Sequence, residues 1–442
     1  MKKLFSLLVF LFMAMVFMGC ERTDKTYVEA PDIIGDSLSQ AKLKINGEFK
    51  LNVINIPSHQ YLPGFVLSYG SKIKPGDKIE SGSEIDVNVS GYPKDSFSLS
   101  DEVDYVSYIS RITGPGSINA ELLRSAGVGC TDLGIPIDLG DEVILLYGDT
   151  YSDTESMSGF WNSNFIARTK DTTLWDGILF DSVVTTGIGI VRPFAQGLHD
   201  GNYSDSQSNN PNREVTKIPT GGIKINNDIY IFYMSVRFWG IPGEWKVNYN
   251  QVVKTDSSFQ TFTEVGSLRW PESMAPNFAQ IFPIVDNENP DIIYLLGIPG
   301  GRNGGTTLAR VNQNNFENFE EYEYYVSEGT WSKGSNGLAQ LKSNPYYIID
   351  PLCGEMSIMY NRYLQKWMAV YLRGSQIVMV TADEITGPYS LPKALMSSNE
   401  FGGLYGGFVL DKFTEYDGKK FYIQLSQWLP IYQTSVVEVI LK

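Results

Sequence analysis

The sequence predicts a mostly β protein, in which a small α+β module precedes a five-bladed β-propeller. From about residue 109 to the end, the chain consists almost entirely of strand segments and turns. One unit recurs about every 40–60 residues: a strand, a turn, a second strand with a small polar signature, and an aromatic edge segment. About 330 residues in such units correspond to five blades. A pair of β-sandwiches is the main rival, but it would not explain the shared internal order.

Residues 1–20 are expected to be a targeting segment. Lys2 and Lys3 precede the apolar run "LFSLLVFLFMAMVFM", which ends at Gly19-Cys20. The sequence "FMGC" resembles a bacterial lipobox, in which Cys20 is lipidated and becomes the mature N-terminus. The alternative is an ordinary signal peptide with an incidental cysteine. We therefore expect a lipid-anchored protein of the bacterial cell envelope, with periplasmic and outer-surface placement both open.

The segment 31–92 is expected to form the small α+β module. A helix is predicted around 38–45, and strands are predicted at "KLNVINI" and "EIDVNVS", with turns at Pro-Gly pairs. The opening "PDIIG", the stretch "PGFV", "KPG" and the closing "VNVS" resemble a PASTA domain. Some members of that family bind peptidoglycan fragments and many are spacers; we favour the spacer role here. Residues 93–108 are polar and mixed, and are interpreted as a linker.

Composition excludes several classes of function. The formal charge is −15 over 442 residues, with no basic stripe to neutralise phosphates, so nucleic acid is not an expected partner. His59 and His199 are the only histidines, and no cysteine pair has metal-ligand spacing. Serine–histidine nucleophiles and zinc sites are therefore not expected, and no cofactor is predicted. Calcium held by carbonyl and carboxylate oxygens stays open as a structural alternative.

Hydrolytic chemistry in this chain has to come from carboxylates. Asp132 and Asp149 lie 17 residues apart in "TDLGIPIDLGDEVILLYGD", at the start of the β-rich region. Glycosidic cleavage uses two carboxyl groups, one to protonate the leaving oxygen and one to attack or to activate water. Glu355, in "CGEMSIMYN", is a third candidate. The alternatives are a turn cap for each aspartate and a solvated strand end for Glu355. Because a propeller brings inner-strand residues together at its tunnel mouth, burial there is expected to raise the pKa of the general acid.

Several neighbours have the chemistry to bind sugar hydroxyls or to hold a carboxylate ionised. The polar candidates are Asn162 and Asn164 in "WNSNF", Arg302 in the glycine-rich "PGGRNGG", and Asn361 in "MYN". Trp161, Tyr360 and Tyr405 are candidates for stacking on sugar rings, although aromatic residues of this kind more often belong to a β-sheet core. Cys130 and Cys353 each precede one of the acids by two residues, so both a disulfide and two separate buried thiols are open.

The region from about 110 to 442 resembles the five-bladed propeller family of endo-D-arabinofuranases, glycoside hydrolase family 183, formerly a domain of unknown function. The stretches that carry the resemblance are "TDLGIPIDLGDEVILLYGDTY", "FWNSNFIARTKD", "IPTGGIKINNDIYIFYMSV", "YLLGIPGGRNGGTTLARV" and "GEMSIMYNRYLQKWMAVYL". The resemblance implies endo-acting cleavage of α-D-arabinofuranosyl linkages in mycobacterial arabinogalactan and lipoarabinomannan. It also implies that the paired acids of the first blade, Asp132 and Asp149, are catalytic.

Two other functions remain open from the sequence. One is a glycan-binding propeller lipoprotein that does not catalyse cleavage. The other is a furanosidase that acts on a different glycan, such as L-arabinan, because both sugars present similar five-membered rings. Binding without turnover would favour the first, and turnover of the other polymer would favour the second.

Overall fold

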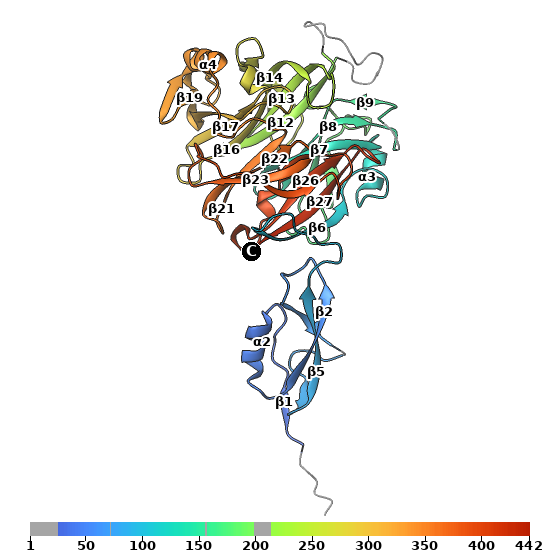
Figure 1. Ribbon diagram of the computed structural model, residues 1–442. Helices are drawn as coiled ribbons and strands as arrows, with labels where there is room; N and C mark the ends of the chain where they lie inside the picture. Colours follow the sequence, from blue (N-terminus) through green and yellow to red (C-terminus); the bar gives the residue numbers. More distant parts are fainter. Residues whose placement is uncertain (1–24, 71, 155–156, 199–213) are drawn as a thin grey trace, which may run out of the picture. The chain divides into compact units, whose positions relative to one another are not determined.

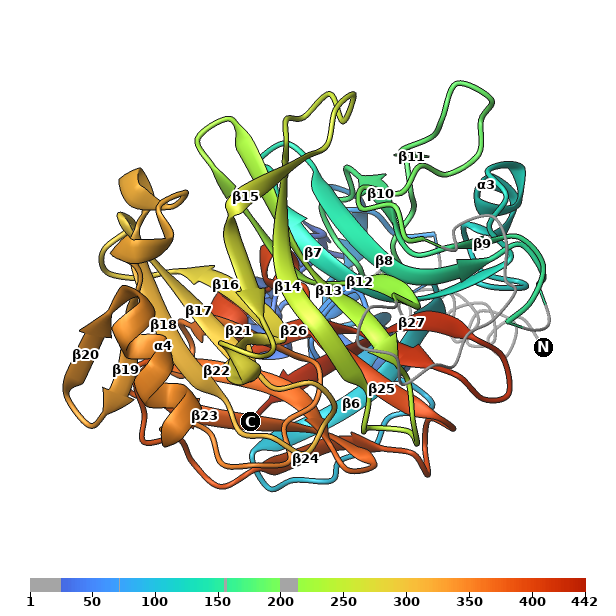
Figure 2. The ribbon, with the colours of Figure 1, turned by 90° about the horizontal axis from the view of Figure 1, so that it is seen from above.

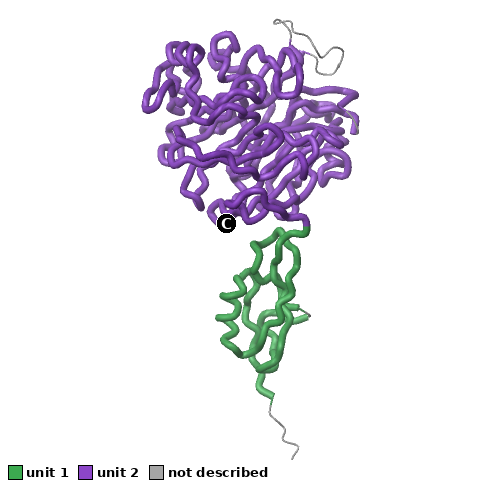
Figure 3. The backbone as a smooth tube through the Cα atoms, in the orientation of Figure 1, with its two compact units in different colours: residues 1–94 green, residues 95–442 purple. Residues whose placement is uncertain are grey.

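The computed structural model describes residues 25–70, 72–154, 157–198 and 214–442. The chain divides into two compact units, residues 1–94 and 95–442 (Figure 3). The predicted signal segment with Cys20 lies outside the described residues, as does His199. Within the described ranges, no helix combines the length and the apolar character needed to cross a membrane.

The first unit has one helix packed on a small sheet, as the sequence predicts. Helix α2 begins after Ser37, whose side chain accepts a hydrogen bond from the backbone of Gln40, and Gln40 caps Ser37 in return. Ala41 and Ile45 are buried on its inner face. The elements are β1 (Tyr27–Glu29), α2 (Leu38–Ile45), β2 (Lys50–Pro57), β3 (Val66–Tyr69), β4 (Lys78–Glu80) and β5 (Glu84–Gly91). Strand β5 pairs in parallel with β2 and antiparallel with β3, and β1 pairs with β4. The resemblance of this unit to a PASTA domain stays a prediction.

The second unit is a five-bladed β-propeller (Figure 1). The first blade contains β7 (Cys130–Asp138), β8 (Val143–Tyr151), β9 (Trp161–Asn162), β10 (Phe165–Thr169) and β11 (Ser182–Val183). The second contains β12 (Thr216–Ile225), β13 (Asp228–Phe238), β14 (Lys246–Thr255) and β15 (Thr263–Pro271). The third contains β16 (Gln280–Val285), β17 (Ile292–Ile298), β18 (Thr307–Asn312), β19 (Glu323–Ser327) and β20 (Thr330–Lys333). The fourth contains β21 (Met356–Asn361), β22 (Lys366–Arg373), β23 (Gln376–Ala382) and β24 (Lys393–Ser397). The mostly β class and the five blades predicted from the sequence are confirmed.

The fifth blade joins the two ends of the propeller. It contains β25 (Leu404–Val409), β26 (Lys420–Gln427), β27 (Gln433–Leu441) and the early strand β6 (Val103–Arg111), which pairs with the last strand β27. This closes the ring without a free edge at the seam. The interpretation of 93–108 as linker is therefore wrong from Val103 onward. The segment alternates polar with apolar residues, and its partner strand is more than 300 residues away in sequence.

The first strand of each blade faces the centre of the ring. Strand β7 contacts β12 on one side and β25 on the other, while β16 contacts β12 and β21. Figure 2 shows the outer strands, such as β11, β20 and β24, at the periphery. Each inner strand begins at the same end of the central tunnel, and the antiparallel second strand returns to that end. Residues at the start of first strands and the end of second strands therefore meet.

The short helices lie between strands. They are α3 (Ala120–Ser125), α4 (Gly334–Ser343) and five 3₁₀ turns: η1 (Pro276–Phe278), η2 (Gln313–Asn315), η3 (Phe319–Glu321), η4 (Asp411–Phe413) and η5 (Tyr416–Gly418). Cys130 and Cys353 are both buried and are not joined by a disulfide, so the alternative of two separate thiols is the one observed. Burial raises the pKa of the Cys130 thiol to about 12 and that of Cys353 to about 11, so both behave as inert core groups.

Candidate active site

A cavity of about 480 Å³ lies at the tunnel end where the inner strands begin. All three acids predicted from the sequence, Asp132, Asp149 and Glu355, line it. Much of the remaining wall is apolar, contributed by inner-strand side chains such as Ile218 and Phe282. A small number of polar groups in an apolar cavity is the usual composition of a small-molecule site.

Asp132 and Asp149 lie on the adjacent first two strands of blade one and line the same cavity. The pairing of β7 with β8 runs from Thr131 opposite Thr150 to Leu133 opposite Tyr147, so Asp132 lies opposite two residues of β8, Gly148 and Asp149, in a β-bulge. Leu133 has a φ of 70°, in the left-handed region that costs a non-glycine residue about 1–3 kcal/mol. Its backbone N–H donates to Ser426 Oγ of blade five at 2.8 Å. The bulge changes the direction in which the Asp132 side chain points. The hydrogen bond from Leu133 to blade five fixes the backbone next to it.

Both aspartates lie inside strands, so the alternative role of turn cap is excluded for each. The opposing residue Gly148 makes room for Asp132. A Cβ atom at position 148 would lie 2.5 Å from Asp132 Oδ1. Glycine at this point is therefore a requirement of the site rather than of the turn chemistry.

Asp132 is a buried carboxyl group with an elevated pKa. Its exposed fraction is 8%, Tyr405 Oη donates to its Oδ2 at 2.7 Å, and among the described residues Oδ1 has no hydrogen-bond partner. Desolvation is the largest effect, and it raises the pKa to about 6. Hydrogen bonds from Tyr432 and Tyr405 lower it, the charge of Glu355 raises it, and Arg302 lowers it. The expectation of a general acid with a raised pKa at the tunnel mouth thus agrees with the surroundings of Asp132.

Asp149 is buried to the same extent, with an exposed fraction of 7%. Trp161 Nε1 donates to its Oδ1 at 2.9 Å, and Thr216 Oγ1 of blade two donates to the same oxygen at 2.6 Å. Trp161 is stacked on Tyr151, with 6.1 Å between ring centroids and 8° between planes. Two donors aimed at one oxygen stabilise the charged carboxylate and fix its orientation. Trp161, expected to stack on a sugar, instead holds this acid in place.

Arg302 and Glu355 form a forked ion pair beside the two aspartates. Arg302 Nη2 donates to Glu355 Oε1 at 2.6 Å, and its Nε lies 3.1 Å from Oε2. The guanidinium group also lies over the rings of Trp245 and Tyr405, at 5.1 Å and 5.3 Å from their centroids. Burial lowers the pKa of Arg302, but the charge of Glu355 and the hydrogen bonds to it have a larger combined effect. The pKa of Arg302 is therefore raised. Arg302 therefore contacts both Glu355 of blade four and Tyr405, whose hydroxyl donates a hydrogen bond to Asp132.

The glycine-rich loop that carries Arg302 is anchored to its surroundings. Gln280, at the start of β16, donates from Nε2 to the carbonyls of Pro299 and Gly301. The backbone N–H of Arg302 donates to Gly243 O, and a Cβ atom at 301 would lie 2.5 Å from that same oxygen. This close approach explains the glycine at 301. The loop positions a charged side chain, as the sequence suggested, but its first partner is Glu355.

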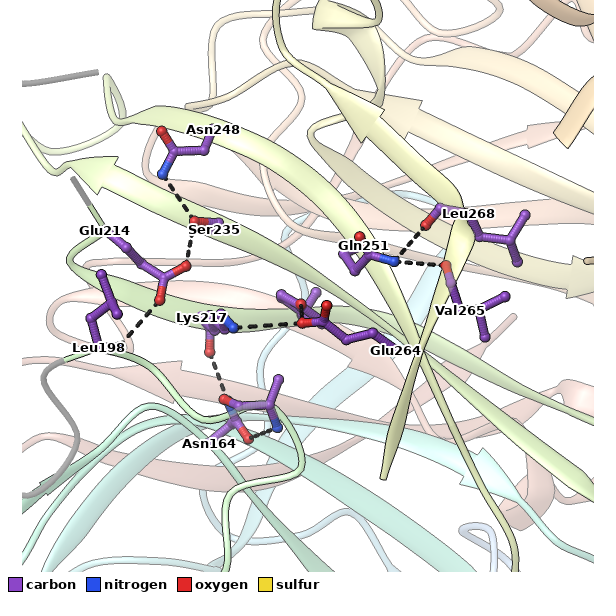
Figure 4. Close-up of polar contacts among 12 residues, drawn as sticks. Asn164, Leu198, Glu214, Lys217, Ser235, Asn248, Gln251, Glu264, Val265 and Leu268 are labelled. Carbon is purple, nitrogen blue, oxygen red and sulfur yellow. Dashed lines mark hydrogen bonds and ion pairs between the residues drawn. The ribbon is translucent and has the colours of Figure 1, made fainter. Parts of the chain in front are cut away.

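Asn162 and Asn164 lie outside the lining of the cavity. Asn164 is fully buried: its Nδ2 donates to the carbonyls of Ala195 and Lys217, and its Oδ1 accepts from the backbone of Phe194 and Ala195 (Figure 4). Asn162 is 4% exposed and pairs with Thr150 in the strand ladder. The expectation that these amides bind sugar hydroxyls is corrected, because Asn164 links blade one to blade two and Asn162 packs inside blade one.

Tyr360 and Asn361 are also separated from the acids. Strand β21 starts at the cavity with Met356, and four residues at about 3.3 Å each carry Tyr360 roughly 13 Å along the tunnel. There Tyr360 lines a second cavity with Arg362 and Asp417. Asn361 is fully buried and holds the following turn through Gly418 O and Leu364 N. The expectation that both belong to the site of the acids is therefore corrected.

Four residues of the site were missed in the sequence. Tyr432 and Thr216 contact the two aspartates, and Trp239 and Trp428 line the mouth of the cavity. Each lies at or directly beside the end of a strand in blade two or blade five, so it is far in sequence from Asp132. The sequence did contain a signal for the two tryptophans, because each directly follows the second strand of its blade, at the end where the acids lie.

The arrangement pairs a desolvated carboxyl that holds a proton near pH 6 with a carboxylate fixed by two donors. Two such groups in one cavity are what acid- and base-assisted bond cleavage needs. In the described parts of the chain, no three His, Cys, Asp or Glu side chains are grouped closely enough to hold a metal ion. Aromatic side chains around the mouth add surfaces on which an apolar ring face can stack.

Fold and site together define a class: a five-bladed β-propeller with a carboxylate-lined cavity at one end of its tunnel. The chain belongs to the family described as Domain of unknown function (DUF4185), whose model matches residues 117–438. That match spans all five blades except the closing strand β6 and the last few residues of β27.

The chain is also similar to individual proteins of known name or structure, at low sequence identity. The Notoamide biosynthesis cluster protein J of Aspergillus sp. (strain MF297-2) is 27% identical over 328 residues, which is 69% of this chain and 81% of that protein. A Bacteroides ovatus protein described as a putative hydrolase is similar in structure, with a TM-score of 0.51 and 12% identity, covering 76% of this chain and 90% of that one. A family 117 glycoside hydrolase from Zobellia galactanivorans has a TM-score of 0.42 and 14% identity, with coverage of 76% and 90%. The similarity to the Bacteroides ovatus protein shows a shared fold.

Proposed function

We propose that this protein is an endo-acting glycoside hydrolase that cleaves α-D-arabinofuranosyl linkages in D-arabinan. One observation carries the chemistry: the buried carboxyl of Asp132, with a pKa raised to about 6, lines the same cavity as Asp149, which lies on the adjacent strand. The polymer is proposed from the resemblance of residues 110–442 to glycoside hydrolase family 183. L-arabinan is the competing substrate.

Asp132 is assigned as the general acid. Near neutral pH its raised pKa keeps a useful fraction protonated, and proton donation to the glycosidic oxygen requires that form. Asp149 is assigned as the carboxylate that attacks the anomeric carbon or activates water, because Trp161 and Thr216 favour its charged form. Glu355 does not act on the substrate in this scheme; its charge, balanced by Arg302, tunes Asp132.

The proposed location follows from residues 1–20. A lipid on Cys20 would tether the propeller to a membrane of the bacterial cell envelope, with residues 21–92 as the spacer. Globomycin treatment of cells, which blocks lipoprotein signal processing, tests this: the mature lipidated form is expected to disappear and the precursor to accumulate. An unchanged mature form would contradict lipidation.

The test of activity is incubation of the purified protein with mycobacterial arabinogalactan, followed by chromatography of released sugars. A ladder of arabino-oligosaccharides is expected, whereas a single product of one or two residues would contradict internal cleavage. Retention of folded protein on the polymer without products would favour a glycan-binding propeller. Products from L-arabinan alone would keep the hydrolase and change the substrate.

A further inference from the structure

Two tryptophans stand on either side of the acids around the mouth of the cavity. Strand β7 of blade one lies between β25 of blade five and β12 of blade two. Trp428 follows β26 in blade five, and Trp239 follows β13 in blade two. Asp149 lies near the end of β8, the corresponding second strand of blade one. The order around the mouth is therefore Trp428, the two aspartates, then Trp239, and all of them line one cavity.

Trp428 is an exposed aromatic surface held in a fixed position. Its side chain is 49% exposed although it lines the cavity. Its backbone N–H donates to Gly403 O at 3.2 Å, and a Cβ atom at 403 would lie 3.0 Å from the indole ring. Gln427 Nε2 donates to Gly402 O, which ties the strand end before the tryptophan to the same loop. A large ring that is half-exposed and yet anchored loses little entropy when a ligand stacks on it.

Trp239 is braced in a comparable way on the other side. It makes an edge-to-face contact with Trp245, with 5.8 Å between centroids and 74° between planes. Trp245 in turn lies beneath the guanidinium of Arg302. The side chain is half-buried and borders the cavity. The support of this ring therefore continues into the ion pair that tunes Asp132.

We propose that Trp428 and Trp239 are two sugar-stacking subsites on opposite sides of the scissile bond, and that they make cleavage internal. This inference rests on the proposed function. A glycan chain laid from one ring to the other passes over Asp132 and Asp149, so sugar units on both sides of the cleaved linkage are bound. The C–H face of a sugar ring packs on an indole ring by burial of apolar surface. The two rings therefore select chains over short fragments.

The experiment uses the full chain with a reducing-end-labelled linear octasaccharide of α-linked D-arabinofuranose and the corresponding disaccharide. Trp428→Ala and Trp239→Ala are each expected to raise KM for the octasaccharide about tenfold, with a smaller change in kcat. The disaccharide, which is too short to reach both rings, is expected to respond less. The labelled products are expected to shift toward opposite ends of the octasaccharide in the two variants.

Two variants serve as controls. Trp175 is 38% exposed and does not line the cavity, so Trp175→Ala is expected to leave KM and products unchanged. Trp428→Phe keeps an aromatic face and is expected to recover most of the wild-type KM. Thermal unfolding of each variant separates a stacking loss from a folding loss.

The outcomes distinguish this inference from the proposed function. If wild type cuts the octasaccharide and both alanine variants keep the wild-type KM and products, the subsites are overturned and the hydrolase is kept. If wild type binds the octasaccharide without cutting it, the hydrolase fails, and tenfold weaker binding by the two variants, measured by calorimetry, keeps the subsites. Unchanged binding in that case overturns them. An octasaccharide that is neither cut nor bound overturns the subsites and the choice of D-arabinan as the polymer, and the hydrolase is then kept only if L-arabinan is cut.

Discussion

At the scale of single residues, Asp132 is the group proposed as the general acid, and it is held where a charge is unfavourable. A carboxyl with an ordinary pKa of 3.8 titrates near 6 in this cavity, chiefly through desolvation. Its neighbours act in opposite directions: the tyrosines and Arg302 favour the charged form, and Glu355 disfavours it. Burial therefore sets the raised pKa of Asp132, and the charges of Arg302 and Glu355, from two other blades, adjust it in opposite directions.

The pKa of Asp132 also predicts a change in stability. The folded state holds this proton up to about pH 6 and the unfolded chain releases it near pH 4, so the stabilising contribution is complete below pH 4 and is lost as the pH rises through 6. Asp132→Asn removes this dependence. Above pH 6 the variant is expected to be more stable than wild type by about 1–3 kcal/mol, with no advantage at pH 4. Urea unfolding at both pH values measures it, and a variant destabilised at pH 7 would contradict the assignment.

The ion pair predicts opposite shifts of the pH–activity curve. If Asp132 is the general acid, activity falls as the pH rises through its pKa. Glu355→Gln removes a charge that raises that pKa, so the falling limb is expected to move to lower pH, on the order of one unit. Arg302→Met removes a charge that lowers it, and the limb is expected to move to higher pH. Shifts in the same direction would show that the pair does not tune Asp132.

The sequence led to Asp132, Asp149, Glu355, Arg302 and Tyr405 because their residue types suit the chemistry, and all five line the cavity. It misplaced Tyr360, since strand alternation gives the face of a residue but not its depth along the tunnel. It also missed Thr216, whose single hydrogen bond to Asp149 depends on the contact between two blades. Residue type is readable from a sequence, whereas distance along an inner strand is not.

At the scale of elements, the irregular pairing of β7 with β8 positions Asp132 and Asp149, the proposed catalytic pair. The bulge at Asp132, the left-handed Leu133 and the bare Gly148 occur together at one crossing. The sequence predicts both strands but not the two register shifts between them, one on each side of Leu133. Helix α2 is the opposite case: its capping residues Ser37 and Gln40 are local, and its range was predicted correctly.

Gly148→Ala tests this crossing. The added methyl group would lie 2.5 Å from Asp132 Oδ1, so the carboxyl must move away from its present position. Activity is expected to fall by about 10²-fold while the propeller stays folded, as a misplacement of about 1 Å costs that much. Gly266→Ala is the matched control, because nothing lies within 4 Å of its Cβ position on β15. Equal activity in both variants, measured on arabinogalactan, would contradict the role of the crossing.

At the scale of the whole molecule, the ring depends on a strand from its beginning pairing with its last strand. Strand β6 completes blade five, and the small unit before it has a hydrophobic core of its own. Repetition along the sequence predicted the number of blades, because each blade repeats the same internal order. The closing strand was taken for linker, since closure pairs the two ends of the domain and leaves no local signal.

Two truncated chains distinguish the contribution of the first unit to stability from that of the closing strand β6. A chain of residues 95–442 retains β6 and is expected to fold with a melting temperature within a few degrees of the full protein. A chain of residues 113–442 lacks β6, exposes the edge of β27 and is expected to aggregate or to unfold far more readily. Circular dichroism melting of both compares them. Equal stability would show that the seam does not hold the ring together.

The most direct test of the account compares wild type with Asp132→Asn on mycobacterial arabinogalactan. Wild type is expected to release a ladder of arabino-oligosaccharides, and the variant, folded to the same extent, to lose activity by roughly 10²–10⁴-fold. The rate of wild type is also expected to fall as the pH rises through about 6. Equal release of oligosaccharides by the two proteins, or none by a folded wild type, would contradict the claim that this buried aspartate drives glycan cleavage.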